Sequence, residues 1–523
     1  MAHPLPLTRL ACALMCLALA PSMALAQVAP VTSTSTAPLF TPFTAPGALP
    51  SLGDNSELSA AAERRIGERI AASIYRDPDY IDDPVLVDYV QSIWQPLLAA
   101  ARARGELSQE LDERFAWTIF LARDRSINAF ALPGGYFGLH LGLIGVVSSR
   151  DELAAVLGHE LSHVTQRHIS RLLTQQSRQA PWLIASMILA ALVASKSAAA
   201  ANAAIVGGQA LAAQGQLNFS RDMEREADRV GFGVMVDAGF DARGVGSMFE
   251  KLQQSARLND SGGFAYLRSH PLTVQRIAEV QSRLQLVSAP SVSSANTGAA
   301  RTYHAMMAAR AKVLVNPGVD ALRALVAEAS SPKTPSAGVL YGAALASAKL
   351  RDYSTASVWA QQLQTIVQGD AARRAGELLL LELDLMAGKV PPNAASIDLT
   401  KTTARADVLV RGRALLAAGQ PQVVSSRLYS WVAEHPKDAG AWQMLSTAFN
   451  AQGQAVRAIR ADAEAHVVEL DYPAALDRFK AAQALMREQP GAADFMESSI
   501  IDTRARQVAL LVKEQALQDK VDR

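Results

Sequence analysis

The chain has 523 residues, which is too long for one ordinary domain, so we expect two or three folded units. Half of the residues are hydrophobic and only 6% are aromatic, which favours helices packed through small side chains over a β-sandwich. The 50 basic residues nearly balance the 49 acidic ones, so the composition gives no reason to expect nucleic acid as a partner.

The N-terminus has the pattern of an export signal. Arg9 precedes an apolar run over residues 10–20, and residues 24–26 (ALA) are suited to cleavage by a signal peptidase. We therefore expect residues 1–26 to be a signal peptide that is cleaved near Ala26. Both cysteines of the chain lie in this segment, so the exported protein would contain no disulfide of its own.

The next residues lead into a region of helices and strands. Residues 27–55 are rich in proline, threonine and serine and are predicted to be a flexible leader. After one helical stretch, a second helix is predicted to begin with Asp83 as its N-cap and Pro84 in its first turn. The segments FAWTIFLA (115–122) and GYFGLHLGL (135–143) have the pattern of strands. We expect a small sheet among helices.

The segment VLGHELSHVTQRH, residues 156–168, holds three of the nine histidines of the chain. Ser149 and Glu152 form a capping-box pattern before it, so a helix is predicted to begin there and to run through all three. Residues four apart on a helix share a face, so His159 and His163 can bind one metal ion. The alternative is that these histidines lie on an exposed polar face.

Glu160 follows the first of these histidines. It lies about 100° round the helix, close enough to act on a water at the metal without being a ligand. This arrangement suits peptide hydrolysis, in which zinc lowers the pKa of the water and the carboxylate carries its proton to the leaving amine. His168 would face elsewhere, five residues beyond His163, and we interpret it as structural.

Residues 181–217 are almost uncharged. Lys196 is the single charged residue, and the apolar core of the segment is shorter than the roughly 20 residues of a membrane span. We interpret the segment as a buried helical hairpin. Peripheral contact with a membrane surface or with unfolded client proteins is the alternative.

A third ligand is predicted on a helix over residues 218–232. Glu224 and Asp228 are four residues apart and share a face. Glu224 can therefore reach the metal while Asp228 hydrogen-bonds a ligand histidine. From spacing alone Glu226, which points nearly opposite to Glu224, is a rival ligand, and a solvated run of charges is the alternative without metal.

The last part of the chain has a repeat. Residues 286–300 form a low-charge linker of small residues, where we place a domain boundary. The small and aromatic positions of residues 408–419 recur 34 residues later at 442–453, which is the period of tetratricopeptide helix pairs. Residues 301–523 are therefore predicted to form a tetratricopeptide-repeat domain with a C-terminal helix. Such solenoids commonly bind peptides or proteins on their concave face.

His159-Glu160-x-x-His163 followed by Ser220-Arg221-x-x-Glu224-x-x-x-Asp228 resembles the zinc metallopeptidases of the HtpX/BepA type, which are gluzincins. The resemblance also covers INAFALPGG (127–135), SHPLTVQRI (269–277) and the repeat region. It implies a mainly α fold with a small β-sheet, in which a gluzincin metalloprotease domain (56–285) precedes an α-helical tetratricopeptide solenoid.

The resemblance also implies the roles of individual residues. One zinc ion per chain would be bound by His159, His163 and Glu224. Glu160 would be the catalytic base and Asp228 a supporting acid or proton donor. His270 of the His-Pro loop would take the fourth position and hold the enzyme inactive until the loop moves.

An edge strand at Asn128, Ala129 and Phe130 would pair with an extended substrate, by analogy with related proteases. A simple hairpin turn at Gly134-Gly135 fits the same stretch equally well.

We therefore expect a BepA-like periplasmic zinc endopeptidase that degrades misassembled outer-membrane β-barrel proteins and assists their assembly. By resemblance, its partners would be these clients, the barrel-assembly machinery and the lipopolysaccharide translocon. The alternative is a chaperone or binding protein whose protease site is held closed by His270. A purely structural zinc module fits poorly, because two imidazoles and one carboxylate leave a coordination position for water.

Overall fold

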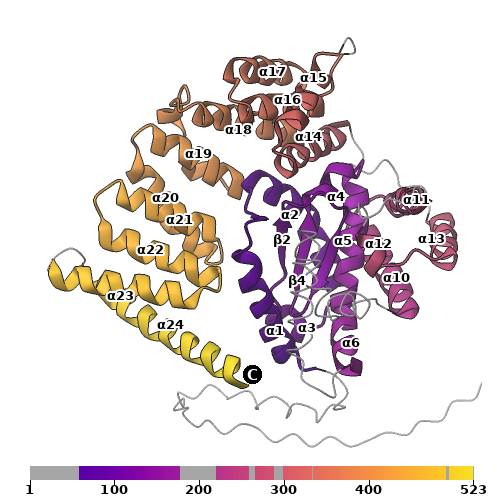
Figure 1. Cartoon of the computed structure of the whole chain (residues 1–523), viewed down its shortest axis with the longest axis horizontal. Coiled ribbons are helices and arrows are strands. Elements are labelled where there is room, and N and C mark those ends of the chain that lie inside the picture. Colours follow the sequence, from indigo (N-terminus) through magenta and orange to yellow (C-terminus); the bar gives the residue numbers. More distant parts are fainter. Residues whose placement is uncertain are drawn as a thin grey trace, which may run out of the picture. The chain divides into compact units, whose positions relative to one another are not determined.

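The computed structural model describes residues 58–176, 220–257, 265–287, 298–331, 334–489 and 494–521 (Figure 1). The predicted signal peptide, leader and apolar segment 181–217 lie outside the described residues, as does most of the predicted linker 286–300. The described residues are mainly helical with one four-stranded sheet, which confirms the predicted fold class.

The first part of the described chain contains the sheet and the helices around it. Its elements are α1 (Ala60–Tyr75), β1 (Tyr80–Ile81), α2 (Pro84–Ala103), α3 (Gln109–Arg114), β2 (Thr118–Ala122), β3 (Ala129–Leu132), β4 (Tyr136–His140), α4 (Leu141–Val146), α5 (Arg150–Thr165), α6 (His168–Gln176), α10 (Arg221–Asp237), α11 (Arg243–Arg257), α12 (Tyr266–Ser269) and α13 (Val274–Leu286). The strand order is β1-β2-β4-β3, with β2 and β4 parallel and the other pairs antiparallel. β3 therefore lies at an edge.

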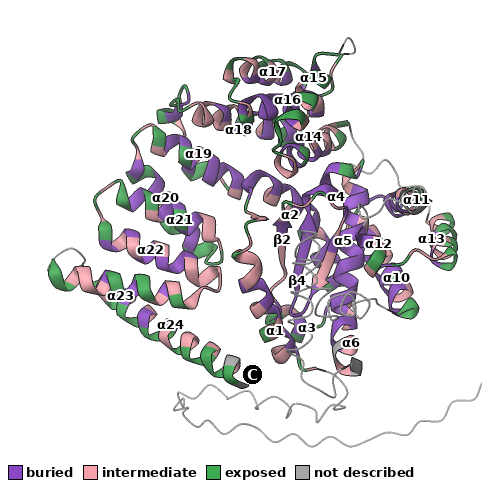
Figure 2. Cartoon of the chain, viewed as in Figure 1, coloured by how far each residue is buried: buried purple, intermediate pink, exposed green. Residues whose placement is uncertain are grey.

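Aromatic side chains pack against both faces of the sheet. Trp94 of α2 lies edge-on to Phe137 of β4, with 4.7 Å between ring centroids, and Tyr75 of α1 lies 5.0 Å from Phe120 of β2. Phe120 is paired with Gly138, the neighbour of Phe137, so the two phenylalanines point to opposite faces. Burying an aromatic side chain of this size contributes about 1.5–3 kcal/mol. Figure 2 shows that α5 is buried along most of its length.

The N-terminus of α5 is capped by side chains, as predicted, with one difference. The Ser149 hydroxyl accepts a hydrogen bond from the Glu152 N–H, which satisfies one unpaired donor of the first turn. The Glu152 carboxylate accepts from the N–H of Ser148 at 2.7 Å and not from that of Ser149. The helix therefore starts at the predicted place.

The prediction that one helix runs through all three histidines is wrong. α5 ends at Thr165, and Arg167 has a φ of 59°, a left-handed conformation that a continuing α-helix does not contain. His168 is the first residue of α6. Its direction relative to His163 therefore cannot be derived from the rotation of a single helix.

The second predicted strand is also shorter than its apolar pattern. β4 ends at His140, and the next residues form α4, in which Leu141, Leu143 and Ile144 are fully buried. A short apolar run fits a buried helix as well as a strand, and here tertiary packing decides between the two. Residues 127–135 contain β3 and its turn, with left-handed glycines at 134 and 135, while pairing of this strand with a substrate stays a prediction.

The second part of the described chain is helical. Its elements are α14 (Gly298–Val315), α15 (Val319–Ala329), α16 (Ala337–Lys349), α17 (Tyr353–Ile366), α18 (Asp370–Met386), the short 3₁₀ turns η2 (Ala394–Ser396) and η3 (Leu399–Lys401), α19 (Arg405–Ala417), α20 (Pro421–Glu434), α21 (Ala439–Asn450), α22 (Ala455–Val468), α23 (Tyr472–Glu488) and α24 (Phe495–Val521). α21 and α22 begin 34 residues after α19 and α20, respectively. The helices have the predicted spacing, while their assignment as tetratricopeptide repeats stays a prediction.

The helical part contacts the N-terminus of α2 through ion pairs, and the pair between Arg310 and Asp83 is buried. Arg310 of α14 binds Asp83 with two hydrogen bonds of 2.7 and 2.8 Å, and it also binds Glu382 of α18. Arg405 of α19 bridges Asp82 and Asp438. Removing one partner of a buried pair leaves an unpaired charge, so these contacts specify how the elements fit together.

One apolar core includes residues on both sides of the predicted boundary at 286–300, which itself stays a prediction. Within the described ranges, none of the helices combines the length and the apolar character that a membrane crossing requires.

Candidate functional site

α5 carries two imidazoles that point to the same place. His159 and His163 are both buried, and their Nε2 atoms are 3.0 Å apart. This follows from their spacing, since side chains four residues apart on a helix project from one face.

α10 approaches α5 closely where both helices have a glycine. A Cβ on Gly231 of α10 would stand 2.9 Å from the main-chain carbonyl of Gly158 on α5, so neither helix has room for a side chain there. Glu224, two turns earlier on α10, consequently reaches the histidines. Its Oε2 is 3.5 Å from His159 Nε2, and its Oε1 is 3.3 Å from His163 Nε2.

His270 enters the same cluster from the segment after α12. Its Nδ1 is 2.9 Å from Glu224 Oε1 and 3.3 Å from His159 Nε2. Its Nε2 is 3.4 Å from Glu160 Oε1. The Tyr266 ring stacks on the His270 imidazole, with 4.5 Å between centroids. The structure therefore brings the predicted His-Pro loop to the predicted ligands.

These donors fit a zinc ion. Two ligand atoms of a tetrahedral zinc site are about 3.3 Å apart, because each lies 2.0–2.2 Å from the metal. The contacts above span 2.9–3.5 Å. Both carboxylate oxygens of Glu160 are buried and lack a hydrogen bond of good geometry from any described residue, as expected of a group that faces a water in the site. One donor atom from each of four buried residues lies within 4.8 Å of the others: His159, His163, Glu224 and His270.

Asp228 and Arg276 support the cluster from one side. Asp228 Oδ1 is 3.0 Å from Nδ1 of His159, the nitrogen that faces away from the cluster. Arg276 of α13 donates two hydrogen bonds to the Asp228 carboxylate, at 2.6 and 2.8 Å, and its third nitrogen is 2.6 Å from Glu224 Oε2. Asp228 thus lies where the sequence places it, beside a predicted ligand histidine.

Burial and ion pairing compete in setting the charges of this group. Burial raises the pKa of Asp228, but the hydrogen bonds from Arg276 and His159 outweigh it and lower that pKa to about 2. Burial lowers the pKa of His159, but its contacts with Asp228 and Glu224 raise it to about 10. Glu224 also has a lowered pKa, because the surrounding histidines overcome its burial. Both carboxylates are therefore ionised at neutral pH.

Burial is the largest influence on the pKa values of His163 and Glu160. Burial lowers the pKa of His163 well below its usual range, so this imidazole is neutral and can offer a lone pair. Burial raises the pKa of Glu160, opposed mainly by His270 and His159. A carboxylate with a raised pKa is a better proton acceptor than an exposed one.

His168 lies against the site, in contrast to the expectation that it faces elsewhere. Its Nδ1 is 2.9 Å from Nδ1 of His163, and its Nε2 is 3.0 Å from Glu226 Oε2. Arg171 binds the same Glu226 oxygen at 2.9 Å. Glu226, the rival ligand by spacing, thus contacts His168 and is absent from the four-residue cluster.

The predicted substrate strand is the edge strand β3. Ala129 is buried, Phe130 is half-buried, and α5 packs against this strand. The carbonyl of Asn128 accepts a hydrogen bond from the N–H of His140. The carbonyl of Ile127 accepts one from the N–H of Tyr266 at 3.2 Å, so the segment before His270 touches the start of this edge.

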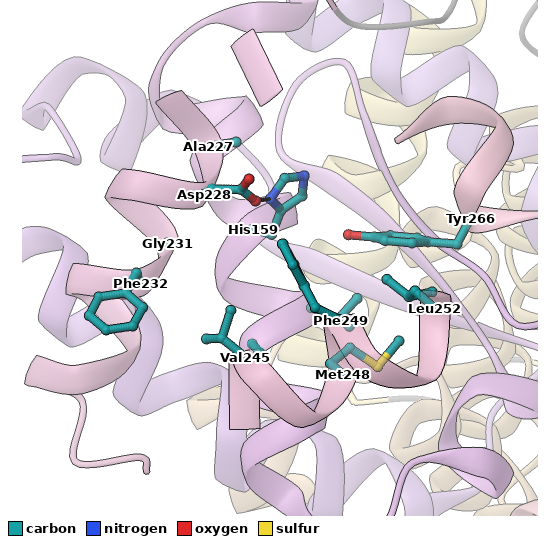
Figure 3. A pocket seen from close by; sticks show the side chains of 12 residues that line it. His159, Ala227, Asp228, Gly231, Phe232, Val245, Met248, Phe249, Leu252 and Tyr266 are labelled. Atoms are coloured by element: carbon teal, nitrogen blue, oxygen red, sulfur yellow. Dashed lines mark ion pairs between the residues drawn. The ribbon is translucent and has the colours of Figure 1, made fainter. Parts of the chain in front are cut away.

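A small apolar pocket of about 30 Å³ lies beside His159. Figure 3 shows Val245, Met248 and Leu252 of α11 on one side of it and the Tyr266 ring on another. An apolar wall next to the cluster keeps water away and strengthens the electrostatic interactions inside it.

Sequence reasoning misses Arg276 and Tyr266. The only signal for Arg276 is its place in SHPLTVQRI, six residues after His270. Tyr266 is fully buried beside the cluster, and burial raises the pKa of its hydroxyl well above the usual value. Both act through contacts between distant segments, which spacing along one helix cannot predict.

Comparison with known proteins gives matches over the same region. Residues 88–284 match Peptidase family M48, and all four residues of the cluster lie within this range. A Vibrio cholerae relative with the name of a beta-barrel assembly-enhancing protease is 34% identical over 60% of this chain and 63% of its own length. The Escherichia coli (strain K12) beta-barrel assembly-enhancing protease is 28% identical over 80% of this chain and 84% of its own. Mitochondrial metalloendopeptidase OMA1 of Arabidopsis thaliana is 30% identical over 30% of each chain.

Proposed function

We propose that the whole chain is a zinc-dependent endopeptidase, from the premise that residues 88–284 match Peptidase family M48. The observation that carries the proposal is the set of four buried donor atoms within 4.8 Å of one another. Imidazole and carboxylate ligands of this kind are typical of hydrolytic zinc sites.

In this proposal His159, His163 and Glu224 hold the ion, and Glu160 is the general base. A zinc ion held there would polarise the scissile carbonyl and lower the pKa of the attacking water. Glu160 takes the proton from the water and delivers it to the leaving amine. The raised pKa of its buried carboxyl supports this role.

We assign Asp228 a positioning role and not that of a proton donor. With a pKa near 2 its carboxylate carries no proton to donate at neutral pH. Its contact with Nδ1 of His159 keeps the proton of that imidazole on Nδ1, which leaves the Nε2 lone pair for the metal.

His270 is proposed to close the site at rest. Its imidazole lies among the ligand atoms, next to Glu160, where an attacking water would have to stand. An imidazole and a water compete for one coordination position, so movement of this segment would switch the enzyme on.

An extended substrate is proposed to pair with the free edge of β3 at Asn128, Ala129 and Phe130. The other edge of β3 is already paired with β4. The N–H of Tyr266 donates a hydrogen bond to the carbonyl of Ile127, at the start of this edge. The segment that carries Tyr266 and His270 would therefore have to move away from both the metal position and the edge strand before a substrate could bind.

The clients and the location are proposed from the names of the relatives, which describe β-barrel assembly in two bacteria. We propose that the enzyme works in the periplasm after cleavage near Ala26 and degrades misassembled outer-membrane β-barrel proteins. Its repeat helices would bind these clients, the barrel-assembly machinery or the lipopolysaccharide translocon.

The test of the proposal is a Glu160→Gln variant in a His270→Ala background. With an unfolded β-barrel protein as substrate, cleavage should fall about 100- to 10,000-fold, the usual contribution of a general base. Glu250→Gln, at an exposed position of α11, is the matched control and should cleave normally. Undiminished cleavage in Glu160→Gln, or less than one zinc per purified wild-type chain, would contradict the proposal.

A chaperone is the second candidate, and the position of His270 in the cluster favours it. In that case Glu160→Gln should still prevent aggregation of the unfolded β-barrel protein as well as the wild type. Loss of that protection in Glu160→Gln would argue that holding of clients depends on proteolysis.

A further inference from the structure

The break between α5 and α6 places a third imidazole, that of His168, beside the site. Arg167, with its left-handed backbone, breaks the helix just before His168, which begins α6. The His168 side chain is fully buried, and its Nδ1 lies 2.9 Å from Nδ1 of His163. This contact is on the side of His163 opposite to Nε2, which faces His159 and Glu224.

Two facing ring nitrogens at this distance share one hydrogen atom, and the cluster determines which ring carries it. Nε2 of His163 needs a lone pair to bind a metal, so the neutral ring must hold its proton on Nδ1. His163 therefore donates to Nδ1 of His168. A neutral His168 then has its own proton on Nε2, where Glu226 Oε2 accepts it at 3.0 Å.

Glu226 is suited to end this chain of hydrogen bonds. Its carboxylate is one-third exposed, and Arg171 binds the same oxygen at 2.9 Å. An ionised carboxylate is a strong acceptor and keeps the donor hydrogens of the chain pointing toward it.

Each of the two predicted ligand histidines is thus connected to a carboxylate through its outer ring nitrogen, one directly and the other through a second histidine. His159 reaches Asp228 directly, at 3.0 Å, while His163 reaches Glu226 through His168. Groups that bind the outer nitrogen of a ligand imidazole hold its orientation and its tautomer. The helical spacing of residues 156–168 does not predict this juxtaposition, because it depends on the break in the helix at Arg167.

We propose that His168 and Glu226 are positioning residues, which hold His163 in the tautomer that binds the metal. The inference rests on the proposed function, since it assumes that His163 is a zinc ligand. It assigns His168 a role in metal binding instead of a merely structural one, and it makes Glu226 part of the site without being a ligand.

The experiment compares zinc affinity in full-length variants, by competition with a chromophoric chelator. His168→Phe keeps the ring and removes both nitrogens, and it should weaken zinc binding about 10- to 100-fold. Glu226→Gln, at a one-third exposed position, should weaken it less but measurably. His304→Phe is the matched control: it removes another fully buried, doubly bonded histidine outside the cluster.

A merely structural role would destabilise His168→Phe and His304→Phe alike and leave zinc affinity at the wild-type value in both. That result would overturn the proposal. If His168→Phe does not fold, unchanged zinc affinity in Glu226→Gln would overturn it equally.

The tautomer provides a second measurement that does not depend on activity. In zinc-loaded protein with ¹⁵N-labelled histidine, His163 should show a protonated Nδ1 in the wild type and a changed Nδ1 shift in His168→Phe. If only the proposed endopeptidase function is wrong, the wild type will bind zinc with His163 in this tautomer but will cleave no substrate. A wild-type Nδ1 signal that is identical in His168→Phe would contradict the chain of hydrogen bonds.

Discussion

Arg276 contacts both carboxylates on the acidic side of the site. Its guanidinium is almost fully buried and contacts Asp228 through two nitrogens and Glu224 through the third. It also donates to the carbonyl of Pro271, directly after His270. One residue therefore connects a predicted ligand, the support of another ligand and the loop proposed to close the site.

Replacing Arg276 by lysine should damage the site although the charge is kept. Lysine cannot form the paired hydrogen bonds of a guanidinium, so Asp228 would lose part of its orientation. We expect about 10- to 100-fold weaker zinc binding and a similar fall in kcat/KM. Arg283→Lys, at a half-buried position of the same helix whose ion pair is with Glu279 at 3.8 Å and not with Asp228 or Glu224, should match the wild type in both measurements.

Wild-type zinc affinity in Arg276→Lys would refute the positioning role of this residue. A fall in kcat/KM without a fall in zinc affinity would instead locate its effect in the movement of the His270 loop.

At the scale of elements, the crossing of α5 and α10 converts two separate motifs into one site. The histidines and Glu224 are some sixty positions apart in sequence. Gly158 and Gly231 permit backbone contact between the helices, so the short carboxylate of Glu224 can reach the imidazoles. A longer interhelical distance would leave the two histidines without their third partner.

Gly231→Ala should separate the two helices. The added Cβ would lie 2.9 Å from main-chain atoms of Gly158, which cannot rotate away as a side chain could. We expect a loss of about 1–3 kcal/mol in unfolding free energy, as for other overpacked cores, together with weaker zinc binding. Denaturant unfolding and chelator competition measure the two effects.

Gly246→Ala is the control, because its Cβ would meet only the end of the Leu284 side chain at 3.0 Å. It should be neutral or slightly stabilising, since alanine is the better helix former. Equal stability of the two alanine variants would show that the helix crossing tolerates a side chain.

At the scale of the whole molecule, the helical part is joined to the metallopeptidase part by buried polar contacts as well as by the shared core. His304 of α14 is one of these contacts. Its Nδ1 is 2.6 Å from the hydroxyl of Tyr89 on α2, and its Nε2 is 2.9 Å from the carbonyl of Val147, after α4. Burial lowers the pKa of His304 below the ordinary value of 6.5.

This lowered pKa predicts a loss of stability in acid. Below about pH 6.5 the unfolded chain protonates His304 while the folded chain does not, so protons favour unfolding. The stabilising effect is complete above pH 6.5 and declines as the pH falls toward the folded pKa. Between pH 7.5 and 5, the unfolding free energy of the wild type should fall more than that of His304→Gln, which has no titrating group at this position.

Urea unfolding at several pH values measures this difference. Glutamine can still hydrogen-bond to Tyr89 and Val147, so at pH 7.5 the variant should lose only about 1 kcal/mol. Parallel pH curves for the two proteins would exclude His304 as a source of the acid sensitivity.

Local sequence was enough to predict the elements with strong periodicity and caps. The helix starts at Asp83 and Ser149 were predictable because the cap and the first turn lie within four residues of each other. The shared face of His159 and His163, and that of Glu224 and Asp228, follow from helix geometry alone. The mainly α fold with a small sheet followed from composition and these patterns.

The tertiary structure decided what depends on contacts between segments far apart in sequence. It ended β4 at His140 and α5 at Thr165, where local pattern favoured continuation. It also placed Arg276 and His168 beside the cluster. The physical reason is range: capping and periodicity act over one or two turns, whereas the partner of a buried charge or imidazole is chosen by whichever distant element packs against it.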